Sequence, residues 1–180
     1  MDAASHDGHD PTATSPRRWN AGRLLIVGVV VALVGFWIYA FSGLARRDHP
    51  DTLDDPAFAA AAEPQCADAV DAITKLPPRS ATASERATTL DEATGILEQL
   101  VGDLRADAPD TTSRDGKLVS AWLADWETYL DDRRAFADEL RDDPEARFLV
   151  TARAGRQVTE PIEAFASVND MASCATPGDA

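Results

Sequence analysis

Histidine is missing from most of this chain. Its 180 residues contain three histidines, His6, His9 and His49, and none follows position 49. The sequence also lacks a GxSxG segment, a glycine-rich nucleotide-binding loop and zinc-type cysteine spacing. Two carboxylates alone can perform glycosidase chemistry, but acidic residues are so numerous that no pair stands out. We therefore predict that the protein is not an enzyme and has no cofactor or metal.

Basic residues are scarce as well. The chain has 17 Lys and Arg against 31 Asp and Glu, a formal net charge of −14. A surface with this charge repels phosphates, which excludes nucleic acid as a partner. Arg147, Arg153 and Arg156 form the one local basic cluster after residue 56, and they are a candidate contact surface for acidic groups.

Only two cysteines are present. Cys66 and Cys174 stand near opposite ends of the C-terminal region, without CxxC spacing or a histidine that would activate a thiolate. In an oxidising compartment they are expected to form a disulfide. Two unrelated buried thiols are the alternative.

Long apolar runs are absent, with one exception. LLIVGVVVALVGFWIYAFSGL, residues 24–44, has no charge and no proline. At 1.5 Å of rise per residue it gives about 31 Å of helix, close to the roughly 30 Å of a hydrocarbon core. We predict a single transmembrane helix that contacts membrane lipid. A cleaved signal peptide is the alternative, but its apolar region would run only about 7 to 15 residues.

The flanks of this run indicate its orientation. Three arginines precede it and two follow it, and basic residues favour the cytoplasmic side: Arg17, Arg18, Arg23, Arg46 and Arg47. We predict that residues 1–23 form a disordered cytoplasmic tail and residues 45–55 a linker. Residues 56–176 would then form an extracytoplasmic helical domain of a single-pass plasma-membrane protein.

Small residues share one side of the predicted span. Gly28, Ala32 and Gly35 are spaced by four and three positions. Such residues let two helices approach closely in lipid, so this face is a candidate for a homodimer. Glycine and alanine are also common in spans generally.

Two helices are predicted in the first half of the outer domain. One runs through residues 56–76, with Asp55 as its N-cap and a break or kink at Pro64. The other begins at Thr82, which has capping-box spacing to Glu85. Residues at helical spacing give each an apolar face: Cys66, Ala69, Val70, Ile73 and Leu76, and then Leu90, Thr94, Leu97, Val101 and Leu104.

A third helix is predicted over residues 117–141, after an ordinary turn at Asp115 and Gly116. At 100° per residue, one arc collects Val119, Trp122, Trp126, Tyr129, Leu130, Arg133, Phe136, Ala137 and Leu140. Such a stripe is typical of a core. Arg133 lies near the centre of the arc, however, so Trp122, Trp126, Tyr129 and Arg133 are also candidates for an anion-binding or aromatic-lined cleft.

A fourth helix is predicted to begin near TEPIEAF. The segment before it fits either a short hairpin that turns at Ala154 and Gly155 or an ordered loop. The apolar face of this helix includes Asn169. Two inward polar groups are costly alone, so we expect Arg133 and Asn169 to share a buried network with a nearby carboxylate. The candidates are Asp91, Glu92, Glu163 and Asp170.

The segments WLADWETYLDDRRAFA and FASVNDMASCATP resemble uncharacterised single-pass membrane proteins of actinobacteria. This resemblance implies a short cytoplasmic tail, one span and a helical outer domain, and it implies no activity.

The fold expected from the sequence is all-α: one transmembrane helix and an outer bundle of about four helices. For function, the acidic outer domain favours an interaction or structural module that binds envelope or membrane-protein partners. The alternative is a protein that binds a small molecule or lipid in the aromatic cleft beside Arg133, with Asn169 nearby.

Overall fold

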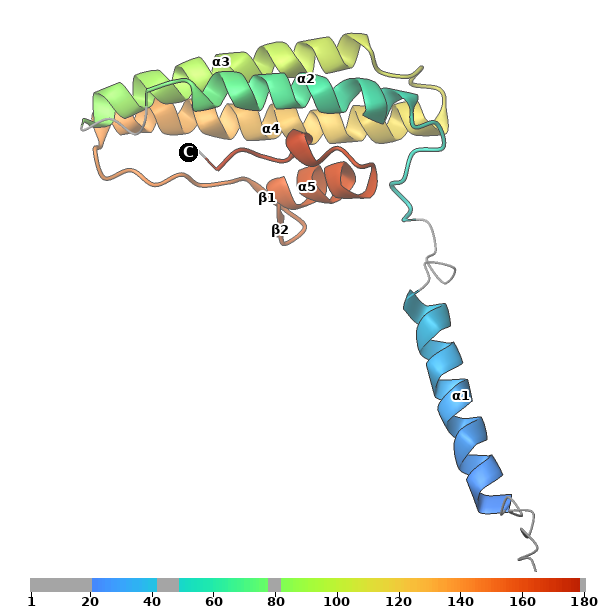
Figure 1. Ribbon diagram of the computed structural model, residues 1–180. Helices are drawn as coiled ribbons and strands as arrows, with labels where there is room; N and C mark the ends of the chain where they lie inside the picture. The colour runs from blue at the N-terminus through green and yellow to red at the C-terminus, as the bar shows by residue number, and fades with distance from the viewer. Residues whose placement is uncertain (1–20, 42–48, 78–81, 179–180) are drawn as a thin grey trace, which may run out of the picture. The chain divides into compact units, whose positions relative to one another are not determined.

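The computed structural model describes residues 21–41, 49–77 and 82–178. They form two separate units, one within Met1–Arg47 and one within Asp48–Ala180. The first contains α1 (Ala21–Phe41), and the second contains the other helices and one two-stranded sheet (Figure 1). The expectation of a mostly helical protein is therefore confirmed. The predicted tail falls almost wholly outside the described residues, as do positions 42–48.

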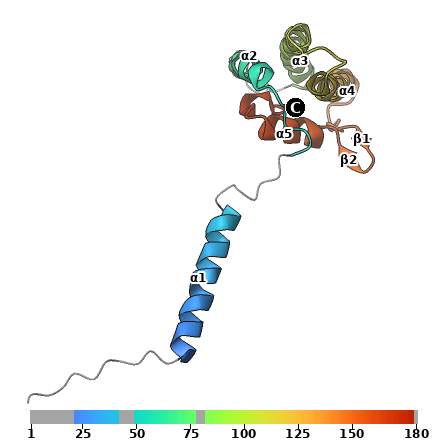
Figure 2. The same ribbon diagram turned by 90° about the vertical axis from the view of Figure 1, so that its right-hand side faces the viewer.

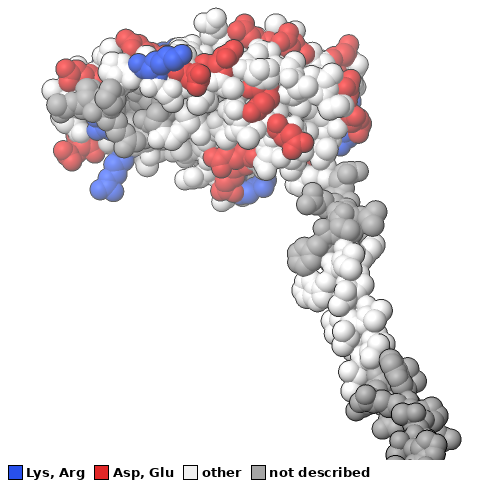
Figure 3. Space-filling model, in the orientation of Figure 1, with Lys and Arg blue, Asp and Glu red and all other residues white. Residues whose placement is uncertain are grey.

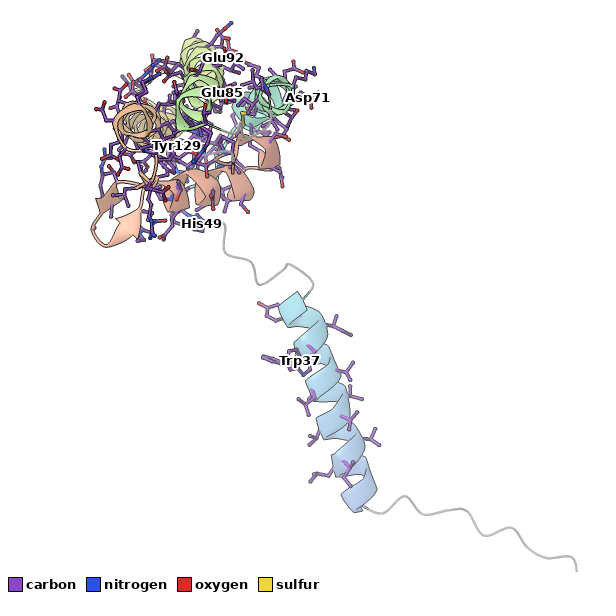
Figure 4. All side chains as sticks on the ribbon, turned by 90° about the vertical axis from the view of Figure 1, so that its left-hand side faces the viewer. Trp37, His49, Asp71, Glu85, Glu92 and Tyr129 are labelled. Carbon is purple, nitrogen blue, oxygen red and sulfur yellow. A yellow bond between two sulfur atoms is a disulfide. The ribbon has the colours of Figure 1, made fainter. Side chains whose placement is uncertain are left out.

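Helix α1 has apolar side chains on every side. The side chains placed in it are those of residues 22 and 25–39, and all of these residues are exposed. They include Trp37, whose ring meets that of Phe36 edge to face at 6.1 Å (Figure 4). Within the part of the chain that the structure describes, no helix is both long and apolar enough to cross a bilayer. The span at 24–44 thus remains a prediction.

Three long helices form the body of the second unit. Helices α2 (Ala57–Thr74), α3 (Ala83–Ala106) and α4 (Arg114–Asp142) lie side by side. Helix α5 (Thr159–Val168) and the short 3-10 helix η1 (Ala172–Cys174) cover one side of them (Figures 1 and 2). The main apolar core fills the space that these elements enclose.

Helix α2 runs through Pro64 without a break, so the expectation of a split was wrong. Proline lacks the amide that would bond back to the preceding turn, which normally ends a helix. Here Pro64 itself is exposed, while Ala62 and Cys66 on either side of it are buried. Packing of this inner face holds the helix together.

Helix α3 begins as its sequence predicts. The Thr82 side chain accepts a hydrogen bond from the Glu85 backbone N–H, and the Glu85 carboxylate accepts one from the Thr82 backbone. This reciprocal cap satisfies two amides that a helix start leaves open. The apolar face expected for this helix is buried: Leu90, Thr94, Leu97, Val101 and Leu104.

Helix α4 begins earlier than expected. Its N-cap is Ser113, so Asp115 and Gly116 lie in its first turn and the predicted turn at these residues was wrong. The preceding loop crosses directly over Gly116, where a Cβ would stand 2.0 Å from the backbone oxygen of Asp110. Only glycine permits this close approach.

The predicted hairpin between the last two helices is present. Strands β1 (Ala152–Arg153) and β2 (Arg156–Gln157) pair antiparallel. Ala154 and Gly155 between them have φ values of 51° and 80°. Positive φ at both central positions is the geometry that fits the twist of a two-residue hairpin.

A disulfide joins Cys66 to Cys174, as predicted, with 5.1 Å between the Cα atoms. It connects the middle of α2 to η1, which are 108 residues apart in sequence. Both cysteines are 1% exposed. The bond therefore closes the second unit from within its core.

Candidate functional site

The aromatic residues of α4 form a continuous buried row. Trp122, Trp126 and Tyr129 are each at most 3% exposed. Trp122 and Trp126 meet edge to face at 6.4 Å, as do Trp126 and Tyr129 at 5.7 Å, and Trp122 stacks on Phe165 of α5 at 5.1 Å. The rings therefore pack directly against one another. The expectation that the stripe packs into a core is confirmed.

The polar atoms of these three side chains differ in whether they form hydrogen bonds. The Trp122 indole N–H donates to the Ile162 carbonyl oxygen at 3.3 Å, and the Tyr129 hydroxyl donates to that of Pro177 at 3.2 Å. Among the described residues, the buried indole N–H of Trp126 has no acceptor. A buried donor left without an acceptor is costly, which marks Trp126 as the polar group that packing alone does not explain.

Arg133 is fully buried and lies against this row. Its Nε–H donates to Thr94 Oγ1 at 3.0 Å, and one terminal nitrogen donates to the Tyr129 hydroxyl at 3.3 Å. The guanidinium carbon is 5.7 Å from the centre of the Tyr129 ring, a distance at which a cation is attracted to an aromatic face. Tyr129 itself lies inside the unit (Figure 4).

Each of the two hydroxyl groups that accept from Arg133 also donates a hydrogen bond. Thr94 Oγ1 donates to the Leu90 carbonyl at 2.7 Å, and Tyr129 donates to Pro177. Arg133 thereby joins α3 to the chain segment that follows η1. This arrangement orients the guanidinium within the core.

Asn169 belongs to a different set of contacts, so the expectation of one shared network was wrong. Its side-chain oxygen accepts from the Leu53 backbone N–H at 2.8 Å. Its amide nitrogen donates to the carbonyls of Phe165, at 2.9 Å, and Asp51, at 3.0 Å. Its partners are therefore backbone groups from the N-terminal and the C-terminal parts of the second unit's sequence.

The carboxylates proposed for that network have other roles. Asp91 forms an ion pair with Arg141, and Glu163 accepts a hydrogen bond from Thr176 at 2.8 Å. Glu92 and Asp170 are exposed. None of these four carboxylates forms a hydrogen bond with the Asn169 side chain in the part of the chain that the structure describes.

Residues 50–55, expected as linker, are fastened onto the helical unit, and we name them the strap. Leu53 is 8% exposed and belongs to the main core. The other end of the strap is held by the first turn of α4, where the Asp115 carboxylate accepts from the backbone N–H groups of Asp54, at 3.1 Å, and Asp55, at 2.9 Å. The unit therefore begins before residue 56.

Arg114 adds to the same anchorage. It donates to the carbonyls of Pro50, at 2.8 Å, and Thr52, at 2.9 Å, and it pairs with Asp54 at 3.0 Å. The hydrogen bond from the Asp55 backbone holds the pKa of the Asp115 carboxyl below its usual value, assisted by the Asp54 backbone and the Arg114 charge, against the effect of burial.

Sequence reasoning missed Arg114 and Asp115. The signal available was a charged residue pair at the N-terminal turn of a helix, where a carboxylate is common for reasons of the helix dipole alone. Nothing in the spacing indicates that this carboxylate binds amides some sixty residues away.

Open grooves on the second unit include three that are lined by described residues. One of them, about 720 Å³, is lined by the end of the strap, the start of α2 and the loop before α4, including Asp54, Phe58, Asp107 and Pro109. The others lie beside α5 and η1 and beside the α3–α4 loop. None of the three is lined by Trp122, Trp126, Tyr129, Arg133 or Asn169.

On the face of the second unit that Figure 3 shows, acidic side chains are scattered widely and basic side chains are fewer. Asp71 on α2 and Glu92 on α3 are exposed and lie on the outer side of their helices (Figure 4). Of the predicted basic cluster, Arg153 pairs with Asp125 at 3.1 Å. Arg147 and Arg156 are exposed, and no described residue pairs with them.

Comparison of the chain with protein-family models, with curated proteins and with solved structures finds no match. The likeness to actinobacterial membrane proteins is thus a prediction from the sequence alone.

Proposed function

We propose that this protein is a membrane-anchored, extracytoplasmic interaction module that presents an acidic helical unit to envelope or membrane-protein partners. The observation that carries the proposal is the contrast between its two units. Helix α1 exposes its apolar residues from 25 to 39, whereas the second unit buries most of its large apolar side chains and exposes carboxylates.

Helix α1 is the anchor in this proposal. Large apolar residues that are half or more exposed, such as Leu25, Ile26 and Phe36, are unfavourable in water and favourable in hydrocarbon. The sequence continues without charge to residue 44. Helices that are apolar all round belong to the interior of a large protein or to a membrane.

The extracytoplasmic location is supported by the disulfide. A buried cystine is typical of proteins from oxidising compartments, because cytosolic thiols are kept reduced. The basic residues before the apolar run favour the same orientation.

The exposed carboxylates of Asp68, Asp71 and Glu92 support partner binding. All three are exposed, and none has an ion pair within the described residues. Unpaired carboxylates on adjacent helices α2 and α3 attract a basic surface and steer its approach.

Two experiments on the full-length protein test the proposal. Alkaline extraction of membranes should leave the chain in the pellet, and a reagent that cannot cross the membrane should label the second unit in intact cells. Recovery of the chain in the supernatant, or labelling only after lysis, would contradict the location.

Partner binding is tested by crosslinking in the native membrane. The variant Asp68→Asn/Asp71→Asn/Glu92→Gln should lose a crosslinked product that the wild type forms. The matched control Asp131→Asn/Glu139→Gln/Asp142→Asn removes the same charge from exposed positions of α4. If both variants keep the product, these carboxylates of α2 and α3 do not take part in binding.

Binding of a small molecule or lipid is the second candidate, and the indole N–H of Trp126 is the observation that favours it. An acceptor atom of a ligand would satisfy this donor. The close packing of Trp122 and Tyr129 against Trp126 opposes it. Titration of the tryptophan fluorescence with envelope lipids and anionic metabolites should give no shift if the row is only a core.

A further inference from the structure

The strap is attached by side chains and not by secondary structure. Asn169 at the end of α5 binds its middle, at Asp51 and Leu53. Arg114 and Asp115 at the start of α4 bind its backbone from Pro50 to Asp55. All of these partners contact main-chain groups of the strap. The site therefore binds the strap, which contains a turn and a bend, through its backbone groups.

We infer that the strap is a releasable latch: it detaches as a unit from Arg114, Asp115 and Asn169 while α2, α3 and α4 remain folded. Detachment lengthens the chain that connects the helical unit to the residues before it. This device operates whether or not α1 lies in a membrane.

The strap contributes only one side chain to the core. Leu53 is the one buried residue of the strap. The long helices pack on each other through their own apolar faces, and the Cys66–Cys174 bond ties α2 to η1 without any strap residue. Opening therefore exposes one large apolar side chain and leaves the bundle closed.

The strap is also the segment of this unit that is best suited to local opening. Ordering six residues costs conformational entropy, which must be offset by the burial of a single leucine and by six side-chain hydrogen bonds, of which one is buried. Segments with few buried contacts and solvent-exposed backbone hydrogen bonds open with much lower free energy than core helices.

Opening has a direct geometric result. Six residues released from the surface add about 20 Å of reach, at roughly 3.3 Å per extended residue. It also frees the Asn169 amide and the Asp115 carboxylate, which are bound to the strap in the closed state. The closed and open states of the latch thus give two different lengths for the chain that leads into the helical unit.

Hydrogen exchange of the full-length protein in detergent micelles tests the latch. In the wild type, the amides of residues 53–55 should exchange faster than those of α3 and slower than those of an unstructured peptide. In Asn169→Ala and, separately, in Arg114→Ala, they should exchange at least about ten-fold faster, with α3 changed by less than about two-fold. Ser167→Ala is the control, since Ser167 is exposed on α5 and has no described hydrogen bond.

Two outcomes would overturn the inference. If α3 accelerates together with residues 53–55 in the variants, the strap opens only when the whole unit unfolds. If residues 53–55 exchange at the same rate in Arg114→Ala, Asn169→Ala and Ser167→Ala, the side chains named above do not hold the strap. Because Arg114 is about half exposed, with 47% of its side chain accessible, its replacement is not expected to prevent folding.

Discussion

Thr94 on α3 accepts a hydrogen bond from Arg133 on α4 at 3.0 Å, and both residues are 0% exposed. Thr94 meanwhile donates to the carbonyl oxygen of Leu90, one turn earlier in its own helix. A single hydroxyl group thus connects a buried charge to the backbone of the neighbouring helix. Thr94 and Arg133 together therefore help to fix how α3 and α4 align along each other.

Replacing Thr94 by valine should lower the free energy of unfolding by about 1–3 kcal/mol, because the Nε–H of Arg133 loses its acceptor inside the core. Thr88→Val is a matched control: Thr88 also bonds to the carbonyl four residues before it, at 3.0 Å, but it is exposed. Thermal or denaturant unfolding of both variants measures the difference. Equal effects would mean that the Arg133 contact adds nothing.

Reduction of the Cys66–Cys174 bond should lower the free energy of unfolding by about 2–5 kcal/mol. Because both sulfur atoms are buried, the native protein should resist both mild reductants and thiol alkylation. Unfolding curves of the wild type and of Cys66→Ala/Cys174→Ala, each with and without reductant, provide the measurement. A wild type whose unfolding is unchanged by full reduction would contradict the prediction.

The strap should give the stability an acid dependence through Asp115. Its folded-state pKa is lowered, chiefly by the hydrogen bond from the Asp55 backbone. The carboxylate therefore contributes stability above its unfolded-state pKa, and this contribution is lost as the pH falls through the lower, folded-state value. Asp115→Asn should flatten the fall in stability between neutral and strongly acidic pH.

Asp125 is a comparator of opposite sign. Burial raises its pKa, although the charge of Arg153 opposes the shift. Because the folded state then binds its proton more tightly, Asp125 favours stability at acid pH and this advantage is lost as the pH rises through its folded-state pKa. Asp125→Asn should steepen the acid-induced fall that Asp115→Asn flattens, and identical profiles for the two variants would refute the assignment.

Gly116→Ala should destabilise the protein by about 1–3 kcal/mol or more, because the added methyl group meets the backbone of Asp110. Gly102→Ala on α3 provides the contrast, since nothing described lies within 4 Å of its added Cβ. There the change should stabilise the helix by about 0.5–1 kcal/mol. Denaturant unfolding distinguishes the two signs.

Self-association through α1 is testable at Gly28. Gly28 and Gly35 have open space around them within the described residues, so a second helix can approach there. Gly28→Leu should reduce chemical crosslinking of the full-length protein to a dimer in membranes. Leu33→Ile, a change of shape without added bulk, should leave it intact.

What could be predicted from the sequence was local. The inward position of Arg133 among aromatic residues follows from 100° of rotation per residue, and it is confirmed because a helix of this length has one face to bury. The cap of α3 and the turn at Ala154 and Gly155 likewise depend on a few consecutive residues. For these features, the local sequence is sufficient to predict the structure.

The strap could not be predicted for the opposite reason. Asn169 meets Leu53 across 116 positions, and Asp115 meets Asp54 across 61. Contacts between a side chain and a distant backbone leave no periodicity, so a charged segment with one proline resembled a linker. The same limitation assigned Arg133 and Asn169 to one network, since both face inward but their partners lie in different parts of the unit.

The Cys66–Cys174 bond also turns most of the helical unit into a covalent ring. A protease that cuts once between these two residues, for example at the exposed hairpin around Gly155, opens the ring but separates no fragment. Both pieces stay attached to the chain that leads to α1. Damage from enzymes in its surroundings would therefore go unnoticed on a non-reducing gel and appear only after a reductant is added.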